Sequence, residues 1–515
     1  MLNQTQRDPR KTRFCGKGKG DTLYMGDTRL FLVRMLLLLA GFCLAAEPAL
    51  ACDQIAPGET LWVRLTSQVS SYSSKPGTPV RAILISTPFC DGAPELVVGS
   101  ELNGQVRSVK KVGLGVRHET ARLEIEFNQI EQSGGTPVEI DARVMELDNA
   151  RETVKQGVIH GVRSTDTPQG RINSRLKHLP TWNPYSDTVL IVYKAAFPVF
   201  PEPEIYLEPG TDVRLELTAP LKLKADTPLA HTVSFSTEET DELNRLAAKL
   251  PERTYTSQHK DSDIVNLLFI GSGEQVRQAF QKAGWEASDT VSKRSVCRNF
   301  YAYLNLTSYA HAPMSRMLLA GEPADMNWEK TLNSYARRDH LRIWKLSDSP
   351  EGETLWASAA TKETSATLSL KQHHFVHHVD PRLDEERAKV VRDLSLAGCV
   401  EAMEIIARPG LEHELHNSIG DPMQTDAGLA VVKLRDCSDP VTGSSLKPTG
   451  SDRSGSRGFR FVRRQVLTFR SDIWRANIIY GTFDAGRMLV TAMRSGHRGI
   501  QMSGEKQAAQ GAAGK

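Results

Sequence analysis

The sequence has little cysteine, and neither sign of charge dominates it. Cysteine accounts for 7 of 515 residues and no two are spaced as CxxC, which argues against a zinc ribbon or a thioredoxin-type redox site. The 64 Lys and Arg residues nearly balance the 61 Asp and Glu residues, and the positive excess lies before residue 52. The rest of the chain is nearly neutral, which argues against a dedicated nucleic-acid-binding protein, since such a protein needs a concentrated basic face; we therefore expect no nucleic acid as a partner.

Long apolar runs are also scarce. One mostly apolar segment, Met35–Ala46, follows two arginines and precedes an Ala49–Ala51 cleavage pattern, which is the arrangement of a secretory signal peptide. Its length of about 12 residues is short of the roughly 20 that cross a bilayer. We therefore expect residues 1–51 to be an N-terminal extension and signal peptide. The mature protein is then periplasmic or secreted, associated with the envelope, with no transmembrane span; an uncleaved anchor is the alternative.

The cysteines that follow this segment bear on the compartment. Five remain after the expected cleavage: Cys52, Cys90, Cys297, Cys399 and Cys437. Export places them in an oxidising compartment, where a disulfide between Cys52 and Cys90 would lie within the first domain. Because five is odd, at least one thiol stays free or pairs between chains.

Residues 52–225 predict a β-rich domain. Leu61, Val63 and Leu65 alternate with polar neighbours, and similar short runs recur between Gly- and Pro-containing turns. This pattern is typical of an antiparallel barrel or sandwich. Two stretches of similar sequence, at 57–66 and 209–218, each begin with Pro-Gly, and we expect the strands that they start to pair with each other.

The second half mixes helices with strands. Residues 226–263 predict a helix, at Thr237–Leu250, and then a polar linker. The apolar run Ile264–Ile270 is typical of a buried strand, and an amphipathic helix follows at 274–284. Further expected elements are strands near 342–346, 355–360 and 402–407 and a helix at 383–396. Residues 264–440 therefore predict an α/β domain.

The C-terminal region predicts three further segments. Residues 441–459 are rich in Ser and Gly and predict a flexible loop, 460–502 a β-rich segment, and 503–515 a disordered tail. The fold class that we expect is α+β and multidomain, with an all-β barrel or sandwich followed by the α/β domain.

A first candidate site is the turn Gly271-Ser272-Gly273 between the expected strand and helix. Amides at a helix start can bind a phosphate, which makes Ser272 a candidate binding residue. The turn lacks the Lys-Ser/Thr of a P-loop and the third Gly of a dinucleotide fingerprint, which favours a purely structural turn.

A second candidate lies at 337–344. On a strand, His340, Arg342 and Trp344 share one face. Arginine offers a bidentate fork to a phosphate or carboxylate and histidine a proton that is tunable near neutral pH, so His340 and Arg342 are candidate catalytic residues and Trp344 a candidate binding residue. The alternative is an exposed sheet face with Arg342 stacked on Trp344.

A third candidate is a histidine-rich segment, where four of the 14 histidines fall within 373–378. On a helix, either His373 and His377 or His374 and His378 would share a face, and such a pair could bind a divalent metal together with Asp380 or Asp384. No HExxH motif accompanies them. The acidic residues that follow, among them Asp384, equally suit the first turn of a helix. A G-x-S-x-G elbow is missing too, which argues against acyl-transfer chemistry.

Six motifs in order give the α/β region a family resemblance. They are Asn266–Ser272, Ala279–Trp285 (AFQKAGW), Pro313–Ser315, Arg338–Trp344, Leu355–Thr361 (LWASAAT) and Asp380–Arg387 (DPRLDEER). Through them, residues of about 263–407 resemble the LssY C-terminal domain, a family named for a component of type I secretion. The resemblance implies an envelope association but no reaction, and it adds Asp384 and Arg387 as candidate binding residues.

The chain departs from this family in two respects. Gly321-Glu322 stands where family members often have Gly-Arg, and a signal peptide and β-domain replace the membrane domains to which they are often joined. Phosphatase activity of such membrane domains is therefore not implied for this chain. The β-domain itself resembles the barrel region of TrbI-type conjugation and secretion proteins.

These observations favour a binding or accessory role at the cell envelope. The expected partner is an envelope protein, of a secretion system for example, or an anionic lipid head group. The alternative is a metal-assisted phosphoester hydrolase with His374, His378 and Asp380 as ligands, His340 as acid/base and Arg342 as anion clamp. The alternative requires both candidate sites to converge on one concave surface.

Overall fold

The computed structural model describes most of the chain after the first 53 residues. The described residues are 54–86, 96–113, 119–131, 137–163, 166–168, 188, 203–222, 234–348, 353–369, 374–438, 440 and 456–476. The predicted signal peptide, a Cys52–Cys90 disulfide, residues 441–455 of the predicted loop and the tail 503–515 lie outside them. These described residues form one compact unit.

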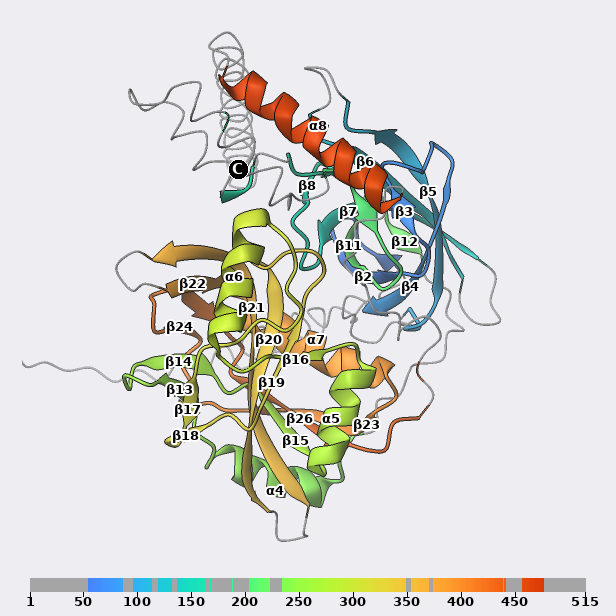
Figure 1. The fold of residues 1–515 in the computed structure, drawn as a ribbon. Coiled ribbons are helices and arrows are strands. Elements are labelled where there is room, and N and C mark those ends of the chain that lie inside the picture. The colour runs from blue at the N-terminus through green and yellow to red at the C-terminus, as the bar shows by residue number, and fades with distance from the viewer. Residues whose placement is uncertain are drawn as a thin grey trace, which may run out of the picture. The chain divides into compact units, whose positions relative to one another are not determined.

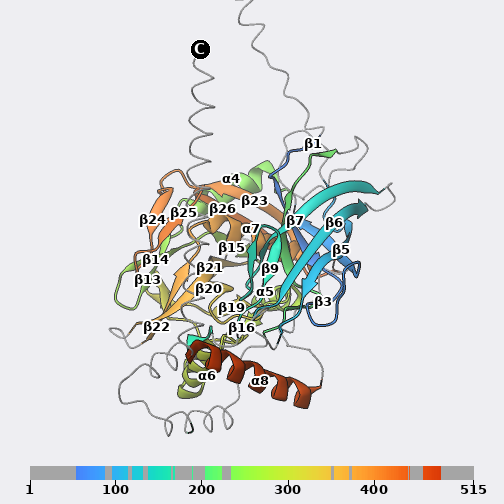
Figure 2. The ribbon, with the colours of Figure 1, turned by 90° about the horizontal axis from the view of Figure 1, so that it is seen from above.

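The first half is a β-barrel, as the sequence predicts. Strands β5, β4, β2, β11, β7 and β6 follow one another in hydrogen-bonded order, and a β5–β6 pairing closes the ring (Figures 1 and 2). The strands of this half are β1 (Gln54–Ile55), β2 (Thr60–Leu65), β3 (Val69–Ser70), β4 (Pro79–Ser86), β5 (Glu101–Lys110), β6 (Arg122–Glu131), β7 (Val138–Leu147), β8 (Thr153–Lys155), β9 (Val158–His160), β10 (Tyr206–Leu207), β11 (Asp212–Leu217) and β12 (Leu221–Lys222).

The two similar stretches do pair. Strands β2 and β11 are antiparallel neighbours, with Val63 opposite Val213. Both follow a Pro-Gly turn in which the glycine, Gly58 or Gly210, has a φ near +90°, a conformation that side chains with a Cβ adopt only with strain. The repeated sequence therefore encodes the same turn and the same start of a strand twice, once before the first long strand of the barrel and once before the last.

The second half is an α/β domain built on a mixed sheet, in the order β16-β19-β20-β21-β15-β26-β23 with β22 beside β21. Its strands are β13 (Arg253–Thr256), β14 (Asp261–Ile264), β15 (Leu267–Ile270), β16 (Glu286–Ala287), β17 (Met317–Leu319), β18 (Glu322–Pro323), β19 (Met326–Lys330), β20 (Arg338–Asp348), β21 (Thr354–Ser369), β22 (His374–Val379), β23 (Val400–Ala407), β24 (Glu414–His416), β25 (Pro422–Gln424) and β26 (Gly428–Leu434). Its helices are α4 (Thr237–Ala247), α5 (Gly273–Lys282), α6 (Lys293–Asn305) and α7 (Leu383–Leu396).

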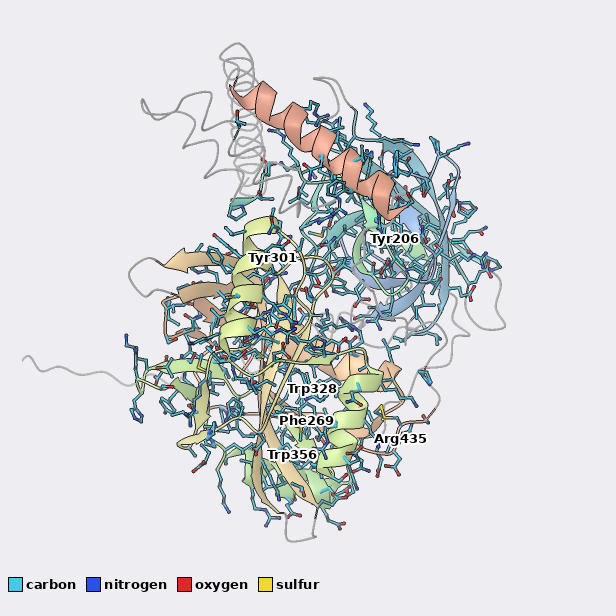
Figure 3. The ribbon with its side chains drawn as sticks, viewed as in Figure 1. Tyr206, Phe269, Tyr301, Trp328, Trp356 and Arg435 are labelled. Atoms are coloured by element: carbon cyan, nitrogen blue, oxygen red, sulfur yellow. A yellow bond between two sulfur atoms is a disulfide. The ribbon has the colours of Figure 1, made fainter. Side chains whose placement is uncertain are left out.

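Helices cover both faces of this sheet. In β15, Leu267 and Phe269 pack with α5 and α7, whereas Leu268 and Ile270 pack with α4. Phe269, Trp328 and Trp356, labelled in Figure 3, belong to the core on the α5 side. Burial on both faces explains why this strand is continuously apolar.

Three local predictions are wrong. The polar linker before residue 264 contains the hairpin β13–β14, because Thr254 and Tyr255 favour extended structure and the chain turns back with His259 in the left-handed region. The N-cap of helix α4 is Ser236, in a reciprocal pair with Glu239, and not Thr237 or Thr240, the caps that the sequence predicts. Residues 374–379 form a strand, not the helix on which the metal hypothesis depended.

The C-terminal segment also differs from its prediction. Residues Arg457–Ala476 form the helix α8, where a loop to 459 and then β-structure were expected. The helical period prevails because it buries Leu467 in the barrel core and places Arg470, three residues later, on the same buried face.

A disulfide that the sequence analysis did not predict joins Cys399 to Cys437. It connects the start of β23 with the residues that follow β26, two strands that are antiparallel neighbours. Cys297, on α6, is an exposed free thiol.

Candidate functional site

The second candidate site is a buried cluster of charged residues on one face of β20 and β21. Alternation along β20 places Arg338, His340, Arg342 and Trp344 on this face, and all four are at most 4% exposed. The alternative prediction of an exposed sheet face is therefore wrong.

Arg338 is the centre of this cluster. Its guanidinium donates to Glu329 Oε2 at 2.5 Å and to Glu363 Oε2 at 2.7 Å. Burial raises the pKa of Glu329 to about 7 despite Arg338. Burial would also raise the pKa of Glu363, but Arg338 and then His377 and His340 hold it well below its usual range. The pKa values of these two neighbouring carboxyls thus shift in opposite directions, because Glu363 faces two histidines as well as Arg338.

His340 lies between Thr361 and this carboxylate. Its Nε2 is 3.0 Å from Thr361 Oγ1, and its Nδ1 is 3.5 Å from Glu363 Oε1. Burial lowers the pKa of His340 to about 3, so the imidazole is neutral at pH 7. A neutral, buried imidazole does not suit the acid–base role that the sequence suggested.

Arg342 already has an anionic partner. Its Nη1 donates to Asp263 Oδ2 at 3.0 Å, and its Nη2 donates to Ser315 Oγ at 3.1 Å. Asp263 thus occupies the position that a ligand phosphate or carboxylate would take. Trp344 is fixed by its indole N–H, which donates to the carbonyl of Glu322 at 3.1 Å.

The proposed metal ligands do not gather. His378 Nδ1 lies 2.9 Å from Asp421 Oδ1, whereas Asp380 accepts hydrogen bonds from Arg382 at 3.0 and 3.1 Å. The side chain of His374 is outside the described part of the chain. Within the described ranges, no three His, Cys, Asp or Glu side chains are placed to hold a metal ion. The geometry therefore does not support the metal-assisted hydrolase.

The remaining candidates bind other parts of the protein. Asp384, near the start of α7, accepts from Thr425 Oγ1 at 2.9 Å and from Arg387, which also binds Asp426. This arrangement attaches α7 to the loop before β26. Ser272 is the N-cap of α5 and bonds reciprocally with Gln275. The turn thus has the structural role that its missing P-loop residues favoured.

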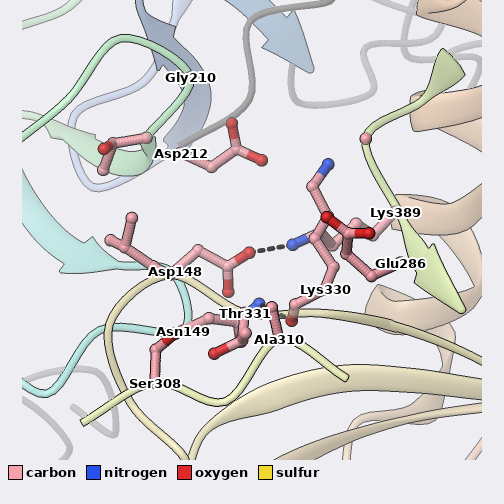
Figure 4. A pocket seen from close by; sticks show the side chains of 13 residues that line it. Asp148, Asn149, Gly210, Asp212, Glu286, Ser308, Ala310, Lys330, Thr331 and Lys389 are labelled. Atoms are coloured by element: carbon pink, nitrogen blue, oxygen red, sulfur yellow. Dashed lines mark hydrogen bonds and ion pairs between the residues drawn. The ribbon is translucent and has the colours of Figure 1, made fainter. Parts of the chain in front are cut away.

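A second set of charges, which the sequence analysis missed, lies where the barrel meets the α/β domain. We call it the junction cluster. Lys389 of α7 pairs with Asp148 from the barrel (Figure 4) and also with Asp339 from β20. Asp148 also accepts from Lys362 Nζ at 2.7 Å, and Asn149 donates to Asp339 at 2.6 Å. The salt bridges of this cluster therefore cross from one domain to the other.

Arg64 extends the junction cluster along the barrel. It donates twice to Asp212 on the neighbouring strand, at 2.6 and 2.8 Å, and once to Asp393 of α7 at 3.0 Å. Asp393 also accepts from Lys330 Nζ at 2.7 Å and from the indole of Trp285 at 3.2 Å. Burial would raise the pKa of Asp393, but Lys330 and Arg64 hold it below its usual range. Both domains thus contribute cations to one buried carboxylate.

A cavity of about 330 Å³ opens beside the junction cluster (Figure 4). Residues of both domains line it: Asp148, Asn149, Gly210, Thr211, Asp212, Gly284, Glu286, Ser308, Ala310, Lys330, Thr331, Leu332 and Lys389. Its two lysines pair with carboxylates of the protein. Among the residues that line this cavity, neither lysine is therefore left unpaired for a phosphate. The candidate residues His340, Arg342 and Trp344 do not line this cavity.

The comparison with protein families matches residues 247–429 to the family described as LssY C-terminus. This segment is an LssY C-terminal domain. The match is wider than the predicted 263–407: it takes in the β13–β14 hairpin and ends at the start of β26. It does not extend to the barrel, so the resemblance to TrbI-type proteins stays a prediction. No curated protein matches the chain.

The LssY motifs meet one another inside the domain. Thr361 of the LWASAAT motif contacts His340, and Ser315 contacts Arg342. The amide of Asn266 exchanges hydrogen bonds with the backbone of Ala360 at 2.9 and 3.0 Å. These motif residues therefore hold the LssY domain together.

No described helix, in the LssY domain or outside it, is long and apolar enough to cross a membrane.

The raised pKa of Glu329 gives the LssY domain a testable pH dependence. A carboxyl whose folded pKa is about 7, against 4.5 unfolded, binds its proton more tightly when folded, so its stabilising contribution falls as pH rises from 4.5 to 7. Glu329→Gln removes this titration. We expect its free energy of unfolding, relative to the wild type, to rise by about 2 kcal/mol between pH 5 and pH 7 in urea titrations.

The pH dependence of stability that His340 causes has the opposite sign, and it serves as an internal check. Its folded pKa of about 3 is below the ordinary 6.5, so its contribution is lost as pH falls below 6.5. In the wild type, protonation of Glu329 stabilises the folded state over the same pH range and offsets this loss. Glu329→Gln lacks that contribution, so its free energy of unfolding should fall steadily from pH 6.5 to pH 4.5. A constant difference between variant and wild type from pH 5 to 7 would contradict the assignment.

Proposed function

We propose that this protein is an exported accessory protein of the cell envelope, with a binding role and no catalytic one. The observation that carries the proposal is the junction cluster. Charged residues of the LssY domain, Lys330, Lys389 and Asp393, form ion pairs with the barrel or with one another. The domain and the barrel belong to one compact unit, which is suited to presenting surfaces to a partner.

Two further features support a location in the cell envelope. The Cys399–Cys437 disulfide suits an oxidising compartment, as does the predicted signal peptide at 1–51. The family of the LssY domain is named for a component of type I secretion, and the proposed partner belongs to that setting: an envelope protein or an anionic lipid surface.

The full chain, expressed with its own N-terminus in a Gram-negative host, tests this proposal. We expect it in the periplasmic or membrane-associated fraction, with Cys399 and Cys437 protected from a thiol-reactive mass tag until reduction. A chain lacking 1–51 should stay in the cytosol, with both thiols open to the tag. Cytosolic full-length protein, or metal-dependent phosphoesterase activity that His378→Ala abolishes, would overturn the proposal.

A further inference from the structure

Helix α8 is strongly basic and is absent from both candidate sites. Its 20 residues contain six arginines and one acidic residue, Asp472. In Figure 1 it is the long red helix that lies along the barrel. It also carries large apolar side chains that the barrel core does not use.

One side of α8 is fixed to the barrel. Leu467 is 1% exposed and joins the barrel core. Arg463 Nη2 pairs with Glu204 at 2.5 Å, and Arg470 donates to the carbonyl of Gly113. The orientation of the helix is therefore set by buried contacts, and so is the side that it turns to solvent.

The solvent side of α8 is apolar. Phe459, Phe461, Val462 and Val466 are 47%, 43%, 58% and 46% exposed. Phe459, Val462 and Val466 have the spacing i, i+3, i+7, which places them in one row along the helix. We call these four side chains the α8 patch. Four large apolar groups exposed on one helix mark a contact surface.

Cations border the α8 patch. The ring of Tyr72 lies 6.3 Å from that of Phe459, and the same ring is approached by Lys111 Nζ at 4.9 Å and by the guanidinium of Arg463 at 5.4 Å. Lys111 and its neighbour Lys110 are exposed at the end of β5. A row of apolar side chains bordered by cations is complementary to a surface whose outer layer is negatively charged and whose interior is apolar.

We propose that the α8 patch docks the protein on an anionic lipid surface, with the apolar row in the acyl boundary and the exposed Lys110 and Lys111 at the phosphates. A helix that has an apolar face and high positive charge, but is too polar as a whole to span a bilayer, lies in the bilayer interface. This inference rests on the proposed envelope location, and it names the partner as lipid.

Vesicle co-sedimentation of the purified full chain tests the proposal. We expect binding to phosphatidylglycerol–phosphatidylcholine vesicles, weaker binding at high salt, and little binding to phosphatidylcholine alone. Val462→Ser/Val466→Ser should lower the partition coefficient about tenfold or more. Lys110→Gln/Lys111→Gln should lower it by about tenfold on anionic vesicles alone.

The controls separate a lipid contact from a contact between two copies of the chain and from loss of folding. Ile405→Ser/Ile419→Ser changes two comparably exposed side chains of the LssY domain, at 46% and 42%, and should leave vesicle binding unchanged. All variants should melt with the wild type. Equal binding of the α8 variant and the wild type overturns the proposal. So does a dimer that Val462→Ser/Val466→Ser dissociates while vesicles stay unbound, because the patch then covers a second copy. Export without vesicle binding refutes this inference and leaves the proposed function standing.

Discussion

Lys389→Met is expected to lower the free energy of unfolding by about 3 to 5 kcal/mol and to uncouple the barrel from the LssY domain. The substitution keeps the aliphatic stem but leaves the buried carboxylates of Asp148 and Asp339 without their shared cation. Breaking a buried ion pair costs this much because the remaining charge stays in a medium of low polarity. Calorimetry should show the single transition of the wild type separating into two.

A surface lysine gives the matched control for this experiment. Lys433 pairs with Glu401 at 3.4 Å, and that glutamate is half exposed. Lys433→Met should change stability by less than about 1 kcal/mol, since exposed pairs contribute little. In the double variant Lys389→Met/Asp339→Asn, removal of one stranded charge should restore part of the loss. Equal losses for Lys389→Met and Lys433→Met would show that the junction cluster does not hold the domains together.

Arg338→Met is expected to cost a similar 3 to 5 kcal/mol at pH 7, through Glu329 and Glu363. Both carboxyls are at most 4% exposed and depend on this guanidinium. Without it the pKa of Glu363 rises, so the folded state binds its proton more tightly and the stability of the variant falls as pH rises. The deficit against the wild type should therefore shrink on going from pH 7 to pH 5.

Chemical denaturation at both pH values tests this expectation. Arg107→Met is the matched control, because Arg107 is 64% exposed and lies 3.5 and 3.7 Å from two glutamates. It should change stability by less than about 1 kcal/mol at either pH. A deficit for Arg338→Met that stays constant with pH would mean that lost packing, and not the stranded carboxylates, causes it.

The parts of the fold that local patterns determine were predictable. The helix at 383–396 has the predicted bounds, and the β2–β11 pairing follows from the repeated Pro-Gly turn. Strand β15 was evident because burial on both faces requires an unbroken apolar run. Each of these signals lies within about ten consecutive residues.

The histidine-rich segment shows where local patterns are ambiguous. His374 and His378 are four apart, a spacing that places side chains on one face in a helix and equally in a strand. The β-branched Val376 and Val379, close to Thr364 and Thr367 on the partner strand, were the signal for the strand. With the strand established, His378 meets Asp421 and not a metal ion.

The junction cluster had no signal of this kind. Asp148 and Lys389 are 241 residues apart, and neither stands in an unusual sequence. Arg64 and Asp393 are 329 apart. A single charged residue is usually solvated, so a buried partner in another domain can be found only once the fold brings the two together. The motif resemblance drew attention to His340 of the LssY domain. No motif marks the barrel residues that make the contacts between the domains.

The β2–β11 pairing has a consequence for folding order. Thr60 is opposite Glu216, so the barrel cannot close until the chain as far as β11 is available. Pairings between such distant residues raise the contact order and slow folding. Any fragment that ends before residue 212 leaves β2 and β7 as bare sheet edges, which are templates for aggregation. Such late closure would help a chain that is synthesised in one compartment and folds in another, because the barrel stays open until β11 has reached the compartment in which the chain folds.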